Sequence, residues 1–137
     1  MSTINALLDE MWESYISYTP SAAKIAKLFN EDIVNDHIAF RTLNLEACNI
    51  HKQANYLSKF GYRIGGDYHF EQKKLNAIHL ENENSNLPKI FLSELMLEKF
   101  SPELNNCFEN IFNSIEVADK DLFMGGRSWD INFEMYK

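Results

Sequence analysis

The stretch that decides the fold is Asn35-Asp36-His37-Ile38-Ala39-Phe40-Arg41-Thr42, in which polar and apolar side chains alternate. Successive side chains of a β-strand point to opposite faces. The alternation therefore predicts a strand with His37 and Arg41 on one face and Ile38 and Phe40 on the other. A strand face that carries both an imidazole and a guanidinium is a candidate for ligand binding.

The segments that follow predict one helix and three more strands. Apolar residues at helical spacing predict a helix over residues 50–60, and Gly61 is placed to end it. Strands are predicted over residues 62–64 with an extension toward Phe70, over 75–80 and over 89–97. The predicted order of elements is therefore β-α-β-β-β.

Helices are predicted on both sides of this unit. An apolar stripe from Ile4 to Tyr15 predicts a first helix capped by Ser2 or Thr3, and Thr19-Pro20 predicts the start of a second. Another helix is predicted to begin at Ser101-Pro102, and residues 119–137 are predicted to form a strand or an extended arm. The apolar residues that the second helix is predicted to bury are Ala23, Ile25, Ala26, Leu28 and Phe29.

Length and composition favour one α+β domain. The 137 residues are 45% hydrophobic, which is too apolar for a disordered chain. We expect a single domain over 1–137, made of a helical pair (1–30), a βαβββ module (33–97) and a C-terminal helix and tail (101–137). A net charge of -7 argues against nucleic acid and anionic membranes as partners. Two cysteines without CxxC spacing and the lack of a visible signal segment favour a cytoplasmic location.

His37 and Arg41 lie four residues apart along their predicted strand, which corresponds to about 13 Å. One molecule could contact both side chains only if it is elongated, with polar groups at its two ends. An imidazole suits a divalent metal, whereas the planar fork of an arginine binds a carboxylate through two hydrogen bonds. The pair therefore points to an elongated substrate with carboxylate groups at both ends.

Two more candidate ligands close predicted strand faces that are otherwise apolar. His79 follows Leu75 and Ala77 at a spacing of two, and Glu94 follows Leu92 in the same way. Two imidazoles and one carboxylate form the facial triad that binds Fe(II) in oxygenases. We therefore expect His37, His79 and Glu94 as candidate ligands of Fe(II) or another divalent metal.

Each of these residues also has a purely structural interpretation. A strand histidine can be a hydrogen-bonded, half-buried residue, and Glu94 can be the exposed end of an edge strand. Arg41 can form an ion pair with Asp36, Glu94 or Asp67. His69 can be a surface residue or can support a metal ligand. The aromatic residues that we expect in the core rather than around a substrate are Tyr62, Tyr68, Phe70 and Phe91.

Five blocks of sequence, taken in order, point to a known family. They are Asp36-His37-Ile38-Ala39-Phe40-Arg41-Thr42, Gly61-Tyr62 with Gly66-Asp67-Tyr68-His69-Phe70, Lys73-Lys74-Leu75-Asn76-Ala77-Ile78-His79, Pro88-Lys89-Ile90-Phe91-Leu92-Ser93-Glu94-Leu95 and Phe100-Ser101-Pro102-Glu103-Leu104. In these blocks the chain resembles the 2-oxoadipate dioxygenase/decarboxylase (2-hydroxyglutarate synthase) family. The resemblance runs from about Thr19 to Leu104 and concerns the N-terminal module of that family only.

The resemblance implies a vicinal-oxygen-chelate-like fold in which βαβββ modules enclose a non-haem Fe(II). It also implies a reaction in which O2 and 2-oxoadipate give 2-hydroxyglutarate and CO2, in lysine breakdown. By position in the motif, His37 matches the first metal ligand of the family and Arg41 matches the arginine that binds the substrate carboxylate. His79 and Glu94 fall in matching blocks.

In that family the second histidine and the glutamate ligand come from a second module. A complete site would therefore need either a longer chain or a homodimer that pairs two modules. Two other functions stay open. The chain could be a half-module that binds a small carboxylate or a protein partner without catalysis, or it could be a metal-dependent, glyoxalase-like isomerase or lyase.

Overall fold

The computed structural model describes residues 3–29 and 34–113. The strand or arm predicted for residues 119–137 lies outside these ranges. Contacts divide the chain into two compact units, Met1–Asn35 and Asp36–Lys137. The boundary after Asn35 lies three residues inside the range predicted for the βαβββ module (33–97).

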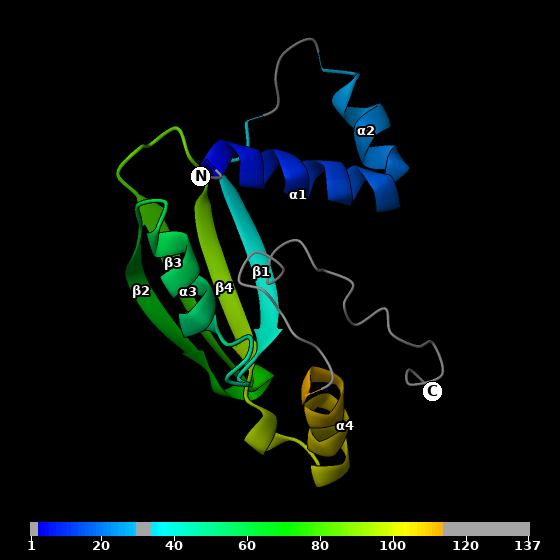
Figure 1. The fold of residues 1–137 in the computed structure, drawn as a ribbon, viewed down its shortest axis with the longest axis vertical. Helices are drawn as coiled ribbons and strands as arrows, with labels where there is room; N and C mark the ends of the chain where they lie inside the picture. The colour runs from blue at the N-terminus through cyan, green and yellow to red at the C-terminus, as the bar shows by residue number, and fades with distance from the viewer. Residues whose placement is uncertain (1–2, 30–33, 114–137) are drawn as a thin grey trace. The chain divides into compact units, whose positions relative to one another are not determined.

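The first unit contains the predicted helical pair (Figure 1), α1 (Ile4–Tyr18) and α2 (Pro20–Ala26). The Thr3 hydroxyl caps α1, because it accepts a hydrogen bond from the N–H of Ala6 at 3.3 Å. Pro20 occupies the first turn of α2, where its fixed φ suits a helix and its missing N–H is not needed. Both helices are therefore confirmed.

The predicted burial of the second helix is wrong for its largest apolar side chains. Leu28 is 79% exposed, and Ile25 and Phe29 are exposed as well. The helix has only 7 residues and ends at Ala26, so Leu28 and Phe29 lie beyond its last turn. A helix of two turns is too short to present the apolar stripe that the sequence pattern suggests.

The second unit is built on a four-stranded mixed sheet with the strand order β1-β4-β3-β2. β1 runs parallel to β4, whereas β4 with β3 and β3 with β2 form antiparallel pairs. The predicted α+β class and the βαβββ order are confirmed. The bounds are β1 (His37–Leu43), α3 (Ile50–Ser58), β2 (Tyr62–Phe70), β3 (Leu75–Asn82) and β4 (Lys89–Leu95).

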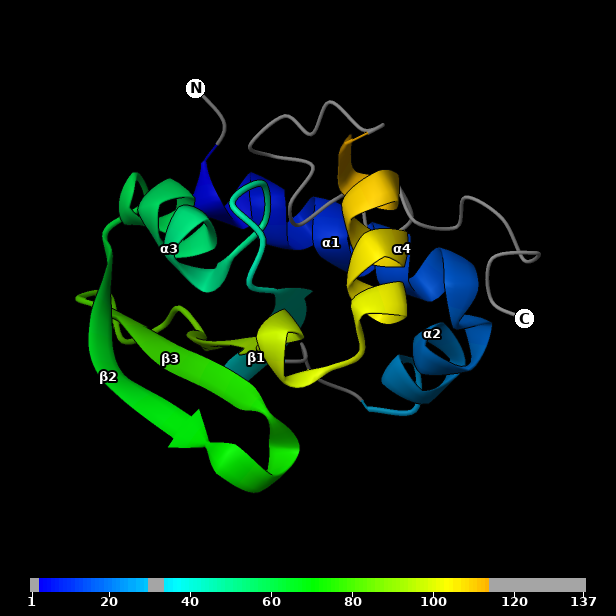
Figure 2. The same ribbon diagram turned by 90° about the horizontal axis from the view of Figure 1, so that it is seen from below.

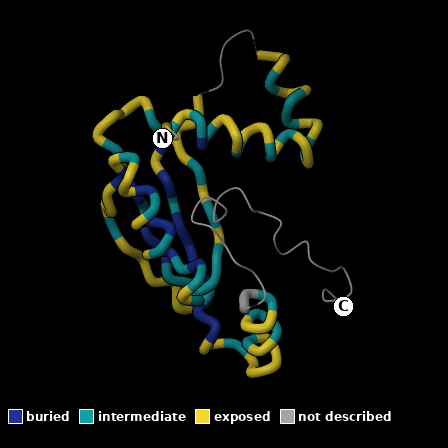
Figure 3. The backbone as a smooth tube through the Cα atoms, viewed as in Figure 1, coloured by how far each residue is buried: buried dark blue, intermediate teal, exposed yellow. Residues whose placement is uncertain are grey.

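One face of this sheet is covered by α3, as Figure 2 shows from below. The side chains buried most completely come from α3 and from the two central strands, whose buried residues are dark in Figure 3. This helix face of the sheet is the hydrophobic core of the unit. Its most buried apolar residues are Ile50, Leu57, Leu80, Ile90 and Leu92.

The turn after α3 explains the role of Gly61. The helix ends at Ser58, two residues before its predicted end at Phe60. Gly61 has φ +86°, a left-handed conformation that costs other residues energy because of their Cβ atom. Gly61 therefore follows the end of the helix, as predicted, and its left-handed conformation lets the chain turn into β2.

Short turns join the last elements. The 3-10 turns η1 (Glu71–Lys73) and η2 (Leu97–Lys99) follow β2 and β4, so the strand predicted over 89–97 ends at Leu95. The predicted C-terminal helix is present as α4 (Pro102–Asn113). Among the helices that the structure describes, none is long and apolar enough to cross a membrane.

Candidate functional site

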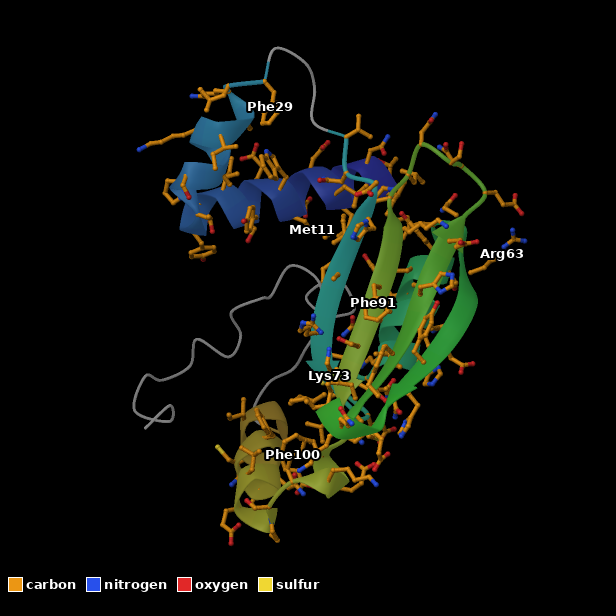
Figure 4. The ribbon with its side chains drawn as sticks, turned by 180° about the vertical axis from the view of Figure 1, so that it is seen from behind. Met11, Phe29, Arg63, Lys73, Phe91 and Phe100 are labelled. Atoms are coloured by element: carbon orange, nitrogen blue, oxygen red, sulfur yellow. The ribbon has the colours of Figure 1, made fainter. Side chains whose placement is uncertain are left out.

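The face of the sheet opposite α3 carries the candidate site residues, and we call it the site face. Figure 4 views the sheet from this side, with Phe91 of β4 pointing away from the core. Strand register places neighbouring side chains in rows across all four strands. The site face comprises His37, Ala39 and Arg41 of β1, Phe91 and Ser93 of β4, Ala77 and His79 of β3, and Tyr68 and Phe70 of β2.

The predicted alternation along β1 is present. His37, Ala39 and Arg41 are exposed, whereas Ile38 and Phe40 are partly buried on the helix face. The imidazole and the guanidinium therefore lie on one face of one strand.

Arg41 is held by a neutral partner. Its Nη1 donates a hydrogen bond to the Oγ of Ser93 at 3.1 Å. Within residues 3–29 and 34–113 its guanidinium forms no ion pair, so the structural alternatives of pairing with Asp36, Glu94 or Asp67 are not observed. An arginine has five N–H donors, so most of them stay available to a ligand.

His37 is oriented by the residue before it. Its Nδ1 lies 3.0 Å from Oδ1 of Asp36, and the side chain is 69% exposed. In a neutral imidazole the Nδ1–H donates to this carboxylate, which leaves the lone pair of Nε2 for a ligand. A carboxylate behind the distal nitrogen is the usual support of a metal-binding histidine. The hydrogen bond and charge of His37 also lower the pKa of the Asp36 carboxyl from its ordinary value.

His79 lies on the site face, but both of its ring nitrogens have partners. Nδ1 is 2.9 Å from the hydroxyl of Tyr68, and Nε2 is 3.5 Å from Oε1 of Glu81. Lys89 donates a hydrogen bond to the same carboxylate at 2.8 Å, and its hydrogen bond and charge lower the pKa of Glu81. The carboxylate favours a proton on Nε2, which leaves Nδ1 to accept the proton of the Tyr68 hydroxyl. In this arrangement His79 offers no free lone pair to a metal.

Two glycines make room for this histidine. A Cβ at Gly65 would lie 2.4 Å from Nε2 of His79, and one at Gly66 would lie 3.0 Å from its Cε1. The β2–β3 register shifts between Ile64 and Gly66, which marks a bulge at Gly65. The imidazole therefore packs directly against the bulged backbone of β2.

Tyr68 was predicted to be a core residue, and this prediction is wrong. It is 42% exposed, and its ring lies 5.8 Å from the ring of His79 and 6.0 Å from that of Phe91. Phe70 is exposed as well, whereas Tyr62 is buried as predicted. Every second residue of β2 faces away from α3, so an aromatic strand places some rings outside the core.

Glu94 does not join the two histidines. It points to the helix face, where its carboxylate accepts a hydrogen bond from the N–H of Ile50 at 3.0 Å. The prediction erred because His79 pairs with Phe91 in the β3–β4 register, so it shares a face with Ser93 and not with Glu94. Accordingly, the described part of the chain brings together no group of three histidine, cysteine or acidic side chains able to hold a metal.

The remaining polar candidates have structural roles. Both ring nitrogens of His69 are hydrogen-bonded, Nδ1 to Asn76 at 2.8 Å and Nε2 to Glu71 at 2.7 Å. Hydrogen bonds to Glu71 and Asn76 raise the pKa of His69. His51 is an exposed residue in the first turn of α3, and Cys48 is buried next to that helix.

Ser93 is the site residue that reasoning from the sequence missed. It is a small polar residue within an apolar strand, and its importance follows only from its register with Arg41. The sequence signal that could have found it is a lone hydroxyl between Leu92 and Glu94, in an otherwise apolar strand that the structure places in the centre of the sheet.

Two curated relatives of the chain share the same description. A chloroplastic/amyloplastic 2-oxoadipate dioxygenase/decarboxylase from Oryza sativa is 25% identical over 147 residues, covering 97% of this chain. A chloroplastic protein of the same description from Arabidopsis thaliana is 25% identical and covers 94% of the chain. The chain spans only 40% of the length of either relative.

Solved structures agree with the fold. A protein from Shewanella frigidimarina is 40% identical, with a TM-score of 0.88 over 99% of this chain and 56% of its own. The hydroxyglutarate synthase of Oryza sativa, solved in complex with 2-oxoadipate, is 25% identical with a TM-score of 0.76, over 90% of this chain and 46% of its own. A glyoxalase superfamily protein from Ralstonia eutropha, at 17% identity and a TM-score of 0.62, shares the fold over 77% of this chain and 36% of its own.

The chain also matches the model of a whole protein family. The family model of 2-oxoadipate dioxygenase/decarboxylase matches residues 1–124, which is most of the chain and includes the complete βαβββ unit. The matched region contains His37 and Arg41 of the site face. The chain therefore belongs to the 2-oxoadipate dioxygenase/decarboxylase family.

Proposed function

We propose that this chain is one module of an Fe(II)-dependent dioxygenase/decarboxylase that acts on a 2-oxo dicarboxylic acid such as 2-oxoadipate. The observation that supports this most is the exposed pair of His37 and Arg41 on β1, in a chain of this family. Along a strand the two residues are about 13 Å apart, which suits an elongated substrate held at both ends.

The proposed reaction balances. A six-carbon 2-oxo diacid and O2 give a five-carbon 2-hydroxy diacid and CO2. The C1 carboxyl group leaves as CO2, one oxygen atom of O2 completes a new carboxyl group at the former ketone carbon, and the other forms the hydroxyl group. Bound Fe(II) would supply the activation of O2.

In this proposal Arg41 anchors the distal carboxylate of the substrate. The two parallel N–H groups of a guanidinium edge match the two oxygens of a carboxylate. The protein carries a net charge of -7, so an arginine that forms no ion pair with any acid of residues 3–29 and 34–113 is a distinct local attraction for an anion. The distance from this anchor to the metal would select for chain length.

His37 is the one described residue whose geometry fits a metal ligand. Its Nε2 has a free lone pair and its Nδ1 is supported by Asp36. A 2-His-1-carboxylate site needs two more ligands, and neither His79 nor Glu94 is placed to provide them. We therefore propose that a second module supplies them, either within a longer protein or from a second copy in a homodimer.

Metal binding by the chain itself tests the role of His37. We expect anaerobic Fe(II) titration to show binding that His37→Ala weakens at least tenfold, since it removes the imidazole that a neighbouring carboxylate orients on the site face. His51→Ala is the matched control, because His51 is an exposed histidine on α3, outside the site face. Unchanged Fe(II) affinity in His37→Ala would contradict the metal assignment.

Substrate binding tests the role of Arg41. We expect 2-oxoadipate to bind the chain and Arg41→Ala to weaken this binding by about tenfold to a hundredfold, as for a lost charge-assisted pair. Arg63→Ala is the control, because Arg63 forms an exposed ion pair with Glu83. Equal losses in the two variants would indicate a general charge effect and would overturn the assignment.

A non-catalytic module that binds a carboxylate is the second candidate. It is favoured by the contact of Arg41 with the uncharged Ser93, which prepares an anion site without any metal. Binding of 2-oxoadipate that does not respond to Fe(II) or to His37→Ala would support this candidate over the enzyme. The second module could come from a longer protein or from a second copy of the chain. Sedimentation at micromolar concentration distinguishes these two origins, because a strictly monomeric chain excludes the homodimer.

A further inference from the structure

We propose that Ser93 is a positioning residue for Arg41, whose buried hydroxyl fixes the guanidinium so that one complete edge faces a carboxylate ligand. The inference deepens the proposed function, because it rests on Arg41 as the carboxylate anchor.

The pairing of β1 with β4 sets the position of the contact between Arg41 and Ser93. Arg41 and Ser93 are register partners in the parallel β1–β4 pair, so their side chains emerge next to each other on the site face. Ser93 is only 1% exposed, so its hydroxyl is shielded from bulk water. Its hydroxyl donates to the carbonyl oxygen of Phe40 at 3.4 Å, which turns the lone pairs of Oγ toward Arg41. The serine is thus an oriented acceptor.

An arginine side chain needs such a support to act as a preformed site. A free arginine loses up to about 2 kcal/mol of rotamer entropy when a ligand orders it. Arg41 is anchored at Nη1 by a hydrogen bond of 3.1 Å before any ligand arrives. Part of the rotamer entropy of Arg41 is therefore lost already on folding, so a smaller entropy loss opposes ligand binding.

The choice of Nη1 matters for what can bind. In a guanidinium, Nη1 lies on the side of Cδ, whereas the N–H groups of Nε and Nη2 point in parallel along the other edge. Ser93 contacts Nη1 and leaves that parallel edge complete. This edge matches the two oxygens of one carboxylate. The structure thus favours a planar, bidentate anion.

The neutrality of Ser93 matters as much as its position. An aspartate or glutamate at this place would also orient Arg41 but would neutralise its charge. The next residue in the row is Ala77, which pairs with Ser93 and is apolar and small. The only acid adjacent in the strand, Glu94, points to the helix face. Arg41 therefore keeps its positive charge for a ligand.

Three variants test this role in the 137-residue chain. Ser93→Ala removes the hydroxyl with little change in volume. The double variant Ala77→Ser/Ser93→Ala keeps the composition and moves the hydroxyl one strand away, by about 4.8 Å, since the two residues are register partners. Arg41→Lys keeps the charge without the fork. Backbone amide spectra verify that each variant is folded.

Two measurements separate positioning from binding. The first is the ¹⁵N order parameter of the Arg41 Nε–H group without ligand, which reports how firmly the guanidinium is held. The second is the affinity for 2-oxoadipate compared with 2-oxohexanoate, which has the same carbon chain but lacks the distal carboxylate. A generally damaged protein would lose affinity for both compounds, whereas a misplaced guanidinium affects only the diacid.

We expect Ser93→Ala to lower the Arg41 order parameter and to weaken 2-oxoadipate binding by about 5- to 20-fold, while the affinity for 2-oxohexanoate stays unchanged. In the swapped variant, Ala77→Ser/Ser93→Ala, we expect the order parameter and the affinity for 2-oxoadipate to stay as low as in Ser93→Ala. An unchanged order parameter, or full restoration by the swapped variant, would overturn the inference. So would an unchanged affinity for 2-oxoadipate. If the order parameter falls in Ser93→Ala but the wild-type chain binds no diacid, Ser93 still positions Arg41 and the proposed function is what fails.

Discussion

The carboxylate of Glu94 on β4 accepts a hydrogen bond from the backbone N–H of Ile50 at 3.0 Å, at the first turn of α3. Glu94 is only 6% exposed, so this bond is largely removed from water. The first N–H groups of a helix have no partner within the helix, and a negative charge there is favourable. Glu94 therefore ties α3 to the sheet on the face that is opposite the candidate site.

From this contact we predict that Glu94→Ala lowers the free energy of unfolding by about 1–3 kcal/mol. Glu94→Gln should lower it less, because the amide oxygen can still accept from Ile50. Urea denaturation measures both effects, with Glu109→Ala on the exposed side of α4 as the control. Fe(II) affinity should not change in Glu94→Gln. A loss of Fe(II) binding without a loss of stability would instead restore Glu94 as a ligand.

A second prediction concerns the bulge under His79. Because a Cβ at Gly65 would lie 2.4 Å from Nε2 of the imidazole, Gly65→Ala should displace the ring and break its hydrogen bond to Tyr68. We expect a loss of about 1–3 kcal/mol in the free energy of unfolding. In the background of His79→Ala the same substitution should cost much less, since the clash is gone. A double-mutant cycle measures this coupling, and additive effects would contradict the contact.

The ion pair of His69 and Glu71 on the exposed side of β2 predicts a pH effect. Hydrogen bonds to Glu71 and Asn76 raise the pKa of His69, and the hydrogen bond from His69 together with the charge of Lys99 lowers the pKa of Glu71. The raised pKa of His69 gives stability that is present below about pH 6.5 and is lost as the pH rises through the folded-state value. For Glu71 the stability is present above about pH 4.5 and is lost as the pH falls.

The pair should therefore stabilise the fold most in the weakly acidic range between these limits. An NMR titration of the His69 ring should show a pKa above its ordinary value, and Glu71→Gln should bring it down. If Glu71→Gln leaves the titration of His69 unchanged, the contact is not formed in solution.

A fourth prediction follows from the support of His37. If this histidine binds Fe(II) as proposed, Asp36→Asn should weaken the binding by about tenfold, because the amide holds the Nδ1 proton less strongly. Stability should stay nearly constant, since Asp36 is exposed. Isothermal titration under anaerobic conditions measures the affinity, and Asp67→Asn on β2 is the matched control. An equal affinity in Asp36→Asn and wild type would exclude a supporting role for Asp36.

The sequence predicted the strands and their faces better than it predicted the site. Alternation along β1 placed His37 and Arg41 together correctly, because it depends on the geometry of a single strand. The proposed triad with Glu94 failed, because it depended on the register between β3 and β4. Both of these strands carry apolar residues on both faces, so their hydrophobic pattern does not show which face α3 covers.

The same limit explains why Ser93 was overlooked. Its neighbour Arg41 is 52 residues away in the sequence, and the β1–β4 pairing that joins them is parallel. Turn residues set the register of hairpins, whereas no turn sets that of two parallel strands. The sequence therefore contains no local signal that two such residues are neighbours in the sheet.

The parallel pairing of β1 also bears on the order in which the fold forms. β2, β3 and β4 follow one another and can pair through short connections, whereas β1 must close a much longer loop to reach β4. We therefore expect β1 to dock last and to open first, so that its amides exchange with deuterium faster than those of β3. His37 and Arg41 would then be the last residues of the sheet to reach their places. A ligand that contacts both binds only when β1 is docked, so it would stabilise the folded state of the whole unit.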